Sequence, residues 1–261
     1  MKLIQAQAEG AIRLSIAASV PVRHQLIIFP HAGGSSEFYR AWRDHLPADI
    51  DLVIMQYPHP SASGVAVNWS EPHAAIQRCM RGLASLLGIA PITLFGHSMG
   101  AFLAVHIAAS LELSRFRVAQ LILSSQMAPA SLQATLQTKQ DIDHLTKQAI
   151  GLGEVPELSR STSTVQTVVA SAIHQDLALL QKLVRLPIGQ LPVTRIFGGD
   201  SDPLIDREKL FEWLESLPKN TALELFPGGH FYFIDQVPLV VETILGSSGS
   251  VWPSHSSNPN A

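Results

Sequence analysis

Cysteine is almost absent from this chain of 261 residues, because Cys79 is the only one. A single cysteine excludes an internal disulfide and a zinc site built from several thiolates. Cys79 also lies on the apolar stripe of a predicted helix, so we interpret it as a small core residue rather than a reactive thiol. Such sparse use of cysteine is typical of a reducing compartment, and we expect a cytoplasmic protein.

Charge is scarce as well, with charged residues making up 15% of the sequence and a formal net charge of −3. Because no basic stripe could neutralise phosphates, we expect no nucleic-acid partner. No apolar run approaches the ~20 residues that cross a bilayer. The first ten residues contain no continuous apolar segment followed by a cleavage site. The sequence therefore predicts neither a membrane association nor secretion.

Hydrophobic residues are plentiful, at 46% of the sequence, which allows a large core. We expect one domain over residues 1–246, since α/β folds of this size commonly form a single domain. Residues 247–261 consist largely of Ser, Pro, Asn and Gly and cannot bury enough surface to become ordered. We predict a flexible C-terminal tail there.

Short apolar runs alternate with helical patterns along the chain. Strands are expected at residues 25–29, 52–57, 92–95, 118–124, 193–197 and 222–226. A helix is expected between Pro72 and Gly88, where apolar residues recur at helical spacing. This order predicts an α/β fold with a mostly parallel central sheet and helices on both faces.

One segment, about residues 129–187, interrupts this alternation because it has helical composition and no convincing strand. Its best helical stretches are residues 141–150 and 165–184. A structureless loop of that length is improbable in a compact domain. We therefore expect a helical lid insertion, placed over the carboxyl ends of the strands.

The sequence Gly96-His97-Ser98-Met99-Gly100 lies between a predicted strand and an apolar helical run. A G-x-S-x-G turn in this context is typical of a nucleophile elbow, in which glycines leave room for a strained serine. The elbow predicts an α/β-hydrolase fold with Ser98 as nucleophile. A surface turn is the alternative, and the apolar flanks argue against it. Alternation of side chains is expected to turn the His97 ring away from Ser98.

A serine hydroxyl needs a histidine base and a carboxylate that orients the histidine. In this fold the acid and then the histidine follow the serine along the chain. His230 is the candidate base, because it follows a late strand in a glycine turn. Asp202 is the preferred acid, and Asp200, which could instead brace the loop, is the alternative. The segment after residue 124 offers no carboxylate.

The oxyanion formed during acyl transfer needs hydrogen-bond donors, and removing one donor costs ~3 kcal/mol. The first donor is the backbone N–H of Met99, directly after the nucleophile. We assign the second to the backbone N–H of Ala32, in a loop rich in small residues. His31 in the same loop is interpreted as an orienting or structural residue rather than a catalytic one.

Several motifs together resemble one known family, the free-standing type II thioesterases that accompany nonribosomal peptide and polyketide synthases. The resemblance extends over about residues 26–246 and is most specific at Phe-Pro-His-Ala-Gly-Gly-Ser, residues 29–35. Further matching segments are residues 38–42, 46–47, 56–58, 96–101, 172–177, 198–203 and 227–231. After residue 58 the family usually continues Gly-Arg and an acidic residue, whereas this chain has His59-Pro60-Ser61-Ala62-Ser63.

The resemblance implies hydrolysis of acyl thioesters on the phosphopantetheine arm of a carrier protein, which removes stalled or misprimed chains. Ser98, Asp202 and His230 match the family's triad. The implied partner is an acyl or peptidyl carrier protein, and the chain itself is expected to bind no cofactor or metal and to be monomeric. The alternatives are a small-molecule esterase or acyl-CoA hydrolase, an acyltransferase, and an inactive binding module.

Overall fold

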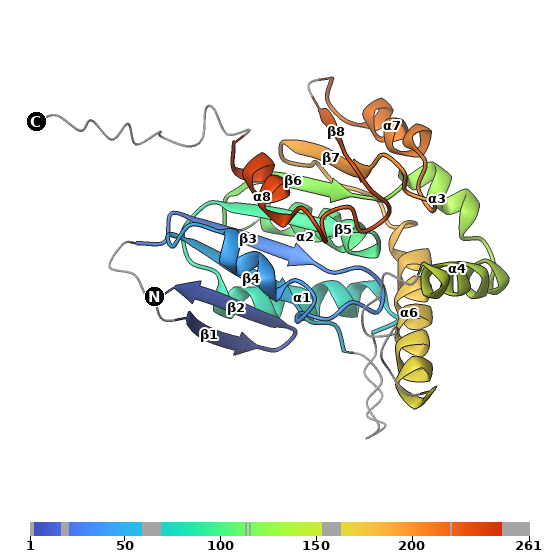
Figure 1. Ribbon diagram of the computed structural model, residues 1–261, viewed down its shortest axis with the longest axis horizontal. Helices are drawn as coiled ribbons and strands as arrows, with labels where there is room; N and C mark the ends of the chain where they lie inside the picture. The colour runs from blue at the N-terminus through green and yellow to red at the C-terminus, as the bar shows by residue number, and fades with distance from the viewer. Residues whose placement is uncertain are drawn as a thin grey trace, which may run out of the picture.

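The computed structural model describes residues 3–16, 21–58, 69–112, 114, 116–152, 163–219 and 221–246. Two features of the sequence lie outside these residues: the predicted tail at 247–261 and the unusual segment 59–63. The chain forms a mixed sheet in which the strands follow the order β1-β2-β4-β3-β5-β6-β7-β8 (Figure 1).

Six parallel strands build the main part of the sheet and confirm the six predicted strands to within two residues at every end. They are β3 (His24–Phe29), β4 (Ile50–Met55), β5 (Ile92–His97), β6 (Val118–Ser124), β7 (Thr194–Gly199) and β8 (Ala222–Phe226). Side chains of β3 to β5 are buried along their whole length, as expected for strands covered on both faces.

An antiparallel hairpin at one edge was not among the predicted elements. Strands β1 (Leu3–Ala8) and β2 (Ala11–Ile16) pair with each other, and β2 continues the sheet antiparallel to β4. Gly10 takes a positive φ of 76° in the turn between them. Most of β1 is exposed or half-buried, so its sequence shows only a weak apolar pattern. The sheet is nevertheless mostly parallel.

Alternate side chains of the strands enter two cores, one on each face of the sheet. Ile27 and Phe29 of β3 face the core that includes helices α1 (Pro72–Leu86), α2 (Met99–Glu112) and α7 (Arg207–Ser216). Leu26 and Ile28 face the core with the 3-10 helix η1 (Arg40–His45) and α8 (Val237–Gly246). The arrangement confirms an α/β-hydrolase fold with helices on both faces. Within the described ranges, no helix is long and apolar enough to cross a membrane.

The inserted segment forms α3 (Pro129–Thr135), α4 (Lys139–Gly151) and α6 (Ser163–Leu183). The two predicted helices correspond to α4 and α6, and α3 is an additional short helix. In Figure 1, α4 and α6 lie beyond the carboxyl ends of the parallel strands, as the lid prediction required. The division into a domain of residues 1–246 and a tail stays a prediction.

Candidate active site

Ser98 is the single residue between the end of β5 and the start of α2. Its φ of 53° lies in the left-handed region that residues other than glycine rarely adopt. A Cβ on Gly96 would lie 2.5 Å from the Cα of Ala101, and one on Gly100 would lie 2.1 Å from the carbonyl oxygen of Phe29. Only glycine fits at both places, so the backbone has the geometry of a nucleophile elbow.

His230 and Asp202 meet although 28 positions separate them. The Nδ1 atom of His230 lies 2.9 Å from Oδ2 of Asp202, and both side chains are almost fully buried. The other oxygen of Asp202, Oδ1, accepts hydrogen bonds from the backbone N–H groups of Leu204 (2.9 Å) and Ile205 (3.1 Å). The carboxylate is therefore held from both sides, and its contact with Nδ1 leaves Nε2 as the nitrogen able to act as a base.

Asp200 points to the loop that carries the histidine rather than to the histidine ring. Its Oδ1 accepts from the backbone N–H of Gly228 (3.0 Å) and from Oγ of Ser201 (2.9 Å). The hydrogen bond from Gly228 is the main reason why the pKa of Asp200 is lowered. Asp200 thus braces the turn before His230, which was the alternative role considered for it.

A pocket at the carboxyl ends of the strands contains Ser98, His230, His31 and Ala32 in its lining. The remainder of the lining is largely apolar and comes from the insertion and the loops after β6, β7 and β8: Met127, Leu132, Leu145, Ala149, Leu152, Leu177, Leu180, Leu204, Ile205 and Phe231, with Gln126 as a further polar member. The hydroxyl and the imidazole therefore open into one apolar chamber roofed by α3, α4 and α6.

The two predicted oxyanion donors lie beside this chamber. Met99 is the first residue of α2, where backbone N–H groups have no partner within the helix. Ala32 lines the pocket and is about nine-tenths buried. The next N–H along the chain, that of Gly33, donates to Oδ2 of Asp176 over 2.8 Å. This bond directs the Gly33 N–H to the helix α6, so Ala32 remains the better candidate donor.

His97 turns away from the nucleophile, as the alternation of side chains predicts. Its Nδ1 lies 2.9 Å from Oγ of Ser124, which in turn lies 2.8 Å from the hydroxyl of Tyr232. The His97 ring packs 5.0 Å from that of His230. Burial, followed by the charges of His230 and His31, lowers the pKa of His97 well below its usual value. The His97 ring is therefore neutral where it packs against the His230 ring.

His31 is also placed as a structural residue. Its Nδ1 lies 2.9 Å from the hydroxyl of Tyr39, and its ring packs edge-on against Phe231 at 4.6 Å. Sequence reasoning gave no individual role to three residues that support this loop from outside it, Tyr57, Trp69 and Asp176. Tyr57 and Asp176 lie in the matching segments 56–58 and 172–177, but none of the three is a nucleophile, base or acid of the predicted triad. Across the described ranges, no group of three or more His, Cys, Asp or Glu side chains is arranged to hold a metal ion.

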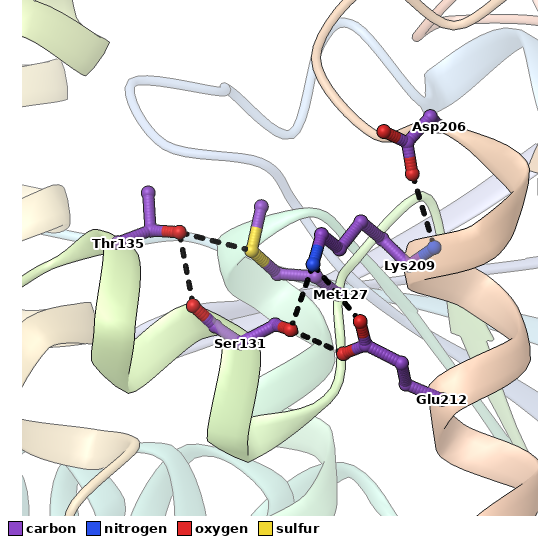
Figure 2. A network of polar contacts seen from close by, with 6 residues as sticks. All are labelled: Met127, Ser131, Thr135, Asp206, Lys209 and Glu212. Carbon is purple, nitrogen blue, oxygen red and sulfur yellow. Dashed lines mark hydrogen bonds and ion pairs between the residues drawn. The ribbon is translucent and has the colours of Figure 1, made fainter.

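The pocket wall formed by the start of α3 is fastened to α7 through polar contacts (Figure 2). Oγ of Ser131 donates to Glu212, and Nζ of Lys209 donates to both Ser131 (3.1 Å) and Glu212 (2.9 Å). Oγ1 of Thr135 donates to the Ser131 carbonyl (2.9 Å) and contacts the sulfur of Met127 (3.6 Å), which lines the pocket. These contacts fix the position of one side of the chamber.

Comparison with known proteins adds a family assignment to this geometry. A family model described as a thioesterase domain matches residues 24–247. Thioesterase TesA of Mycobacterium marinum is 30% identical over 230 residues, which cover 84% of this chain and 88% of that protein. Phenyloxazoline synthase MbtB of Mycobacterium tuberculosis (strain CDC 1551 / Oshkosh) is 31% identical over 230 residues. The matched part is 84% of this chain and only 16% of MbtB, so the chain spans a small fraction of that relative.

Solved structures show the same fold. The type II thioesterase BorB from the borrelidin biosynthetic cluster superposes with a TM-score of 0.73 at 23% sequence identity, covering 92% of this chain and 98% of that chain. YbtT, a type II thioesterase from the yersiniabactin pathway, gives a TM-score of 0.67 at 23% identity over 90% of this chain and 96% of its own.

Proposed function

Since the chain belongs to the thioesterase domain family, we propose that it is a serine thioesterase acting on acyl groups bound to the phosphopantetheine arm of carrier proteins. The observation that carries the proposal is the contact of the buried Asp202 carboxylate with His230, whose ring lines the same pocket as Ser98. A binding module without catalysis would not need a buried imidazole and carboxylate beside a strained serine.

In the proposed reaction, the Ser98 hydroxyl oxygen attacks the carbonyl carbon of the thioester. His230 accepts the hydroxyl proton at Nε2, and Asp202 stabilises the resulting imidazolium through Nδ1. The backbone N–H groups of Ala32 and Met99 donate to the oxyanion of the tetrahedral intermediate.

The intermediate collapses as the carbon–sulfur bond breaks. The pantetheine thiolate leaves and takes the proton from His230, and the acyl group stays on Ser98 as an ester. A water molecule, deprotonated by His230, then attacks this ester. The bond between the acyl carbon and Oγ of Ser98 breaks, and His230 returns the proton to Oγ, which restores the serine. Because a thiolate leaves readily, the rate depends more on attack and on oxyanion stabilisation than on protonation of the leaving group. These reaction steps require no cofactor bound to the chain.

The apolar lining supports an aliphatic acyl group as the preferred substrate. Leucines of all three inserted helices face the chamber, among them Leu132, Leu145 and Leu180. Burying a methylene group in such surroundings contributes roughly 0.8 kcal/mol. Among the residues that the structure describes, no Asp, Glu, Lys or Arg belongs to the lining, so a charged acyl group would lose its hydration without gaining a partner there.

The similar proteins support a role in nonribosomal peptide or polyketide biosynthesis. They include a gramicidin S biosynthesis protein, a phenyloxazoline synthase and ClbQ from the colibactin NRPS/PKS pathway. We propose that this chain removes stalled or misprimed acyl chains from such a synthase in the cytoplasm, as a monomer that binds carrier domains. Hydrolysis of free acyl-CoA or small esters is the second candidate, because the same three side chains would serve it.

A direct comparison of substrates tests the proposal. Decanoyl and malonyl groups are presented as phosphopantetheine thioesters on a bacterial acyl carrier protein, as coenzyme A thioesters and as ethyl esters. We expect the protein to release decanoate from the carrier with a higher kcat/KM than from coenzyme A or the ester, and malonate slowly. Ser98→Ala should abolish release.

Other results of this experiment would indicate a different function or mechanism. Faster cleavage of decanoyl-CoA than of the carrier-bound group would favour the second candidate. Transfer of the decanoyl group to an added amine or alcohol in place of water would identify an acyltransferase. Unchanged activity of Ser98→Ala would overturn the serine mechanism altogether.

A further inference from the structure

Asp176 is a fully buried carboxylate that plays no part in the proposed reaction steps. It lies on α6, the last helix of the lid insertion. Its Oδ2 accepts the backbone N–H of Gly33 (2.8 Å), and its Oδ1 accepts the indole N–H of Trp69 (2.7 Å). A carboxylate with no solvent exposure is costly unless donors satisfy it. One of its donors, the N–H of Gly33, belongs to the loop that carries Ala32. The buried carboxylate therefore connects the lid insertion to the loop of the proposed oxyanion donor.

The residues around Ala32 form a tight turn. The N–H of Gly34 donates to the carbonyl of His31 (3.0 Å), and Gly33 has a φ of 74°. A positive φ at the third position of a four-residue turn identifies the type II arrangement. Type I and type II turns differ by a flip of the central peptide, which here joins Ala32 to Gly33. Asp176 holds the N–H of that peptide.

A second contact holds the start of the loop. The hydroxyl of Tyr57 donates to the carbonyl of Pro30 (3.1 Å), and Tyr57 stacks on Trp69 with ring centroids 5.0 Å apart. A Cβ on Gly33 would lie 2.5 Å from a side-chain carbon of Ile173, so the turn packs directly against α6.

From this geometry we infer that Asp176 is a positioning residue that locks the turn bearing the oxyanion donor Ala32 and couples it to the lid helix α6. The inference rests on the proposed function. A flipped peptide would point the Ala32 carbonyl oxygen at the buried carboxylate, which repels it, so the charge of Asp176 selects one orientation. The selected orientation fixes the peptide dipole next to the proposed donor before substrate arrives, as preorganised catalysis requires.

Asp176→Asn tests the inference because it keeps the shape and removes the charge. The carboxamide has one accepting oxygen for two donors, so its NH₂ group must face either Gly33 or Trp69. We expect kcat for the decanoyl carrier thioester to fall about tenfold or more with KM changed less than about twofold, measured per active site by fluorophosphonate titration. Asp143→Asn is the matched control, since Asp143 also contacts α6, but through His174 (3.0 Å) rather than through the turn. It should leave kcat unchanged.

A double variant separates positioning from general stability. In Trp69→Phe/Asp176→Asn the indole donor is gone, so the carboxamide oxygen is free to accept from Gly33 while the ring at position 69 still stacks on Tyr57. We expect the double variant to regain most of the kcat that Asp176→Asn loses, approaching that of Trp69→Phe alone. A purely structural role for Asp176 predicts the opposite, because two damaged positions should be worse than one.

A kcat of Asp176→Asn equal to the wild type, or a double variant slower than the single one, overturns the inference. If Asp176→Asn gives no folded protein, the double variant decides alone, and a kcat more than tenfold below that of Trp69→Phe overturns it. If the wild type cleaves no thioester, the proposed function fails. The rate at which the fluorophosphonate labels Ser98 then still tests Asp176, because labelling uses the oxyanion donors without a thioester.

Discussion

At the scale of single residues, Asp200 and Asp202 illustrate how two similar carboxylates acquire different tasks. They are separated by one residue and follow the same strand, yet Asp202 contacts the His230 ring and Asp200 contacts the Gly228 backbone. The sequence reduced the candidates for the catalytic acid to these two aspartates. Choosing between them required the direction of each side chain in the folded loop.

Substitution of each carboxylate should separate their tasks. Asp202→Asn leaves the imidazolium without its counter-charge and should lower kcat by roughly 10³- to 10⁴-fold. Asp200→Asn keeps an oxygen that can accept from Gly228, and we expect a loss of less than about tenfold. Steady-state kinetics on both variants, with circular dichroism to verify folding, measures the difference. The reverse order of effects would show that Asp200 is the catalytic acid.

At the scale of elements, α3 depends on α7 for its position. Ser131, Lys209 and Glu212 form a shared set of contacts, and the carboxylate of Asp206 caps the start of α7 through the N–H of Lys209 (Figure 2). The hydrogen bond to Glu212 is the main cause of the raised pKa of Lys209. About 80 positions separate α3 from α7, so sequence patterns could predict a helix but not the contacts that hold it.

Glu212→Gln should weaken this attachment without unfolding the protein. Because the side chains are partly exposed, we expect a loss below about 1 kcal/mol in the free energy of unfolding. Amide hydrogen exchange should nevertheless become faster in α3, since its anchor is lost. Glu215→Gln, on the same helix and outside the network, serves as control. Equal exchange rates in α3 of both variants would contradict the proposed anchoring.

At the scale of the whole molecule, buried histidines connect stability to pH. His24 is almost fully buried, and its Nε2 lies 2.7 Å from the hydroxyl of Thr93 in the neighbouring strand. Burial, followed by the charges of Arg23 and Arg117, lowers the pKa of His24 from 6.5 to about 4. Burial also lowers the pKa values of His97 and His106. The folded protein therefore keeps these rings neutral.

Acid should consequently destabilise the fold before most carboxylates are protonated. The unfolded chain binds a proton at position 24 near pH 6.5 and the folded chain only near pH 4, so unfolding becomes more favourable as pH falls through this window. The stability that His24 contributes is complete above pH 6.5, and its loss approaches roughly 3 kcal/mol at pH 4. Urea unfolding at pH 7.5, 6 and 5 measures the decline, which should be shallower in His24→Gln. A stability that is constant or rises toward pH 5 would refute this.

The sequence by itself determined the parallel strands, the lid helices α4 and α6, and the elbow at Ser98, because each rests on a local pattern of apolar residues or glycines. It did not predict the hairpin β1–β2, whose outer strand β1 is exposed or half-buried along its length and carries little apolar signal. Only the tertiary structure decided which aspartate contacts His230 and that Asp176 reaches Gly33 across 143 positions. Such contacts depend on the relative placement of distant elements, which the packing of the two cores fixes and no local pattern encodes.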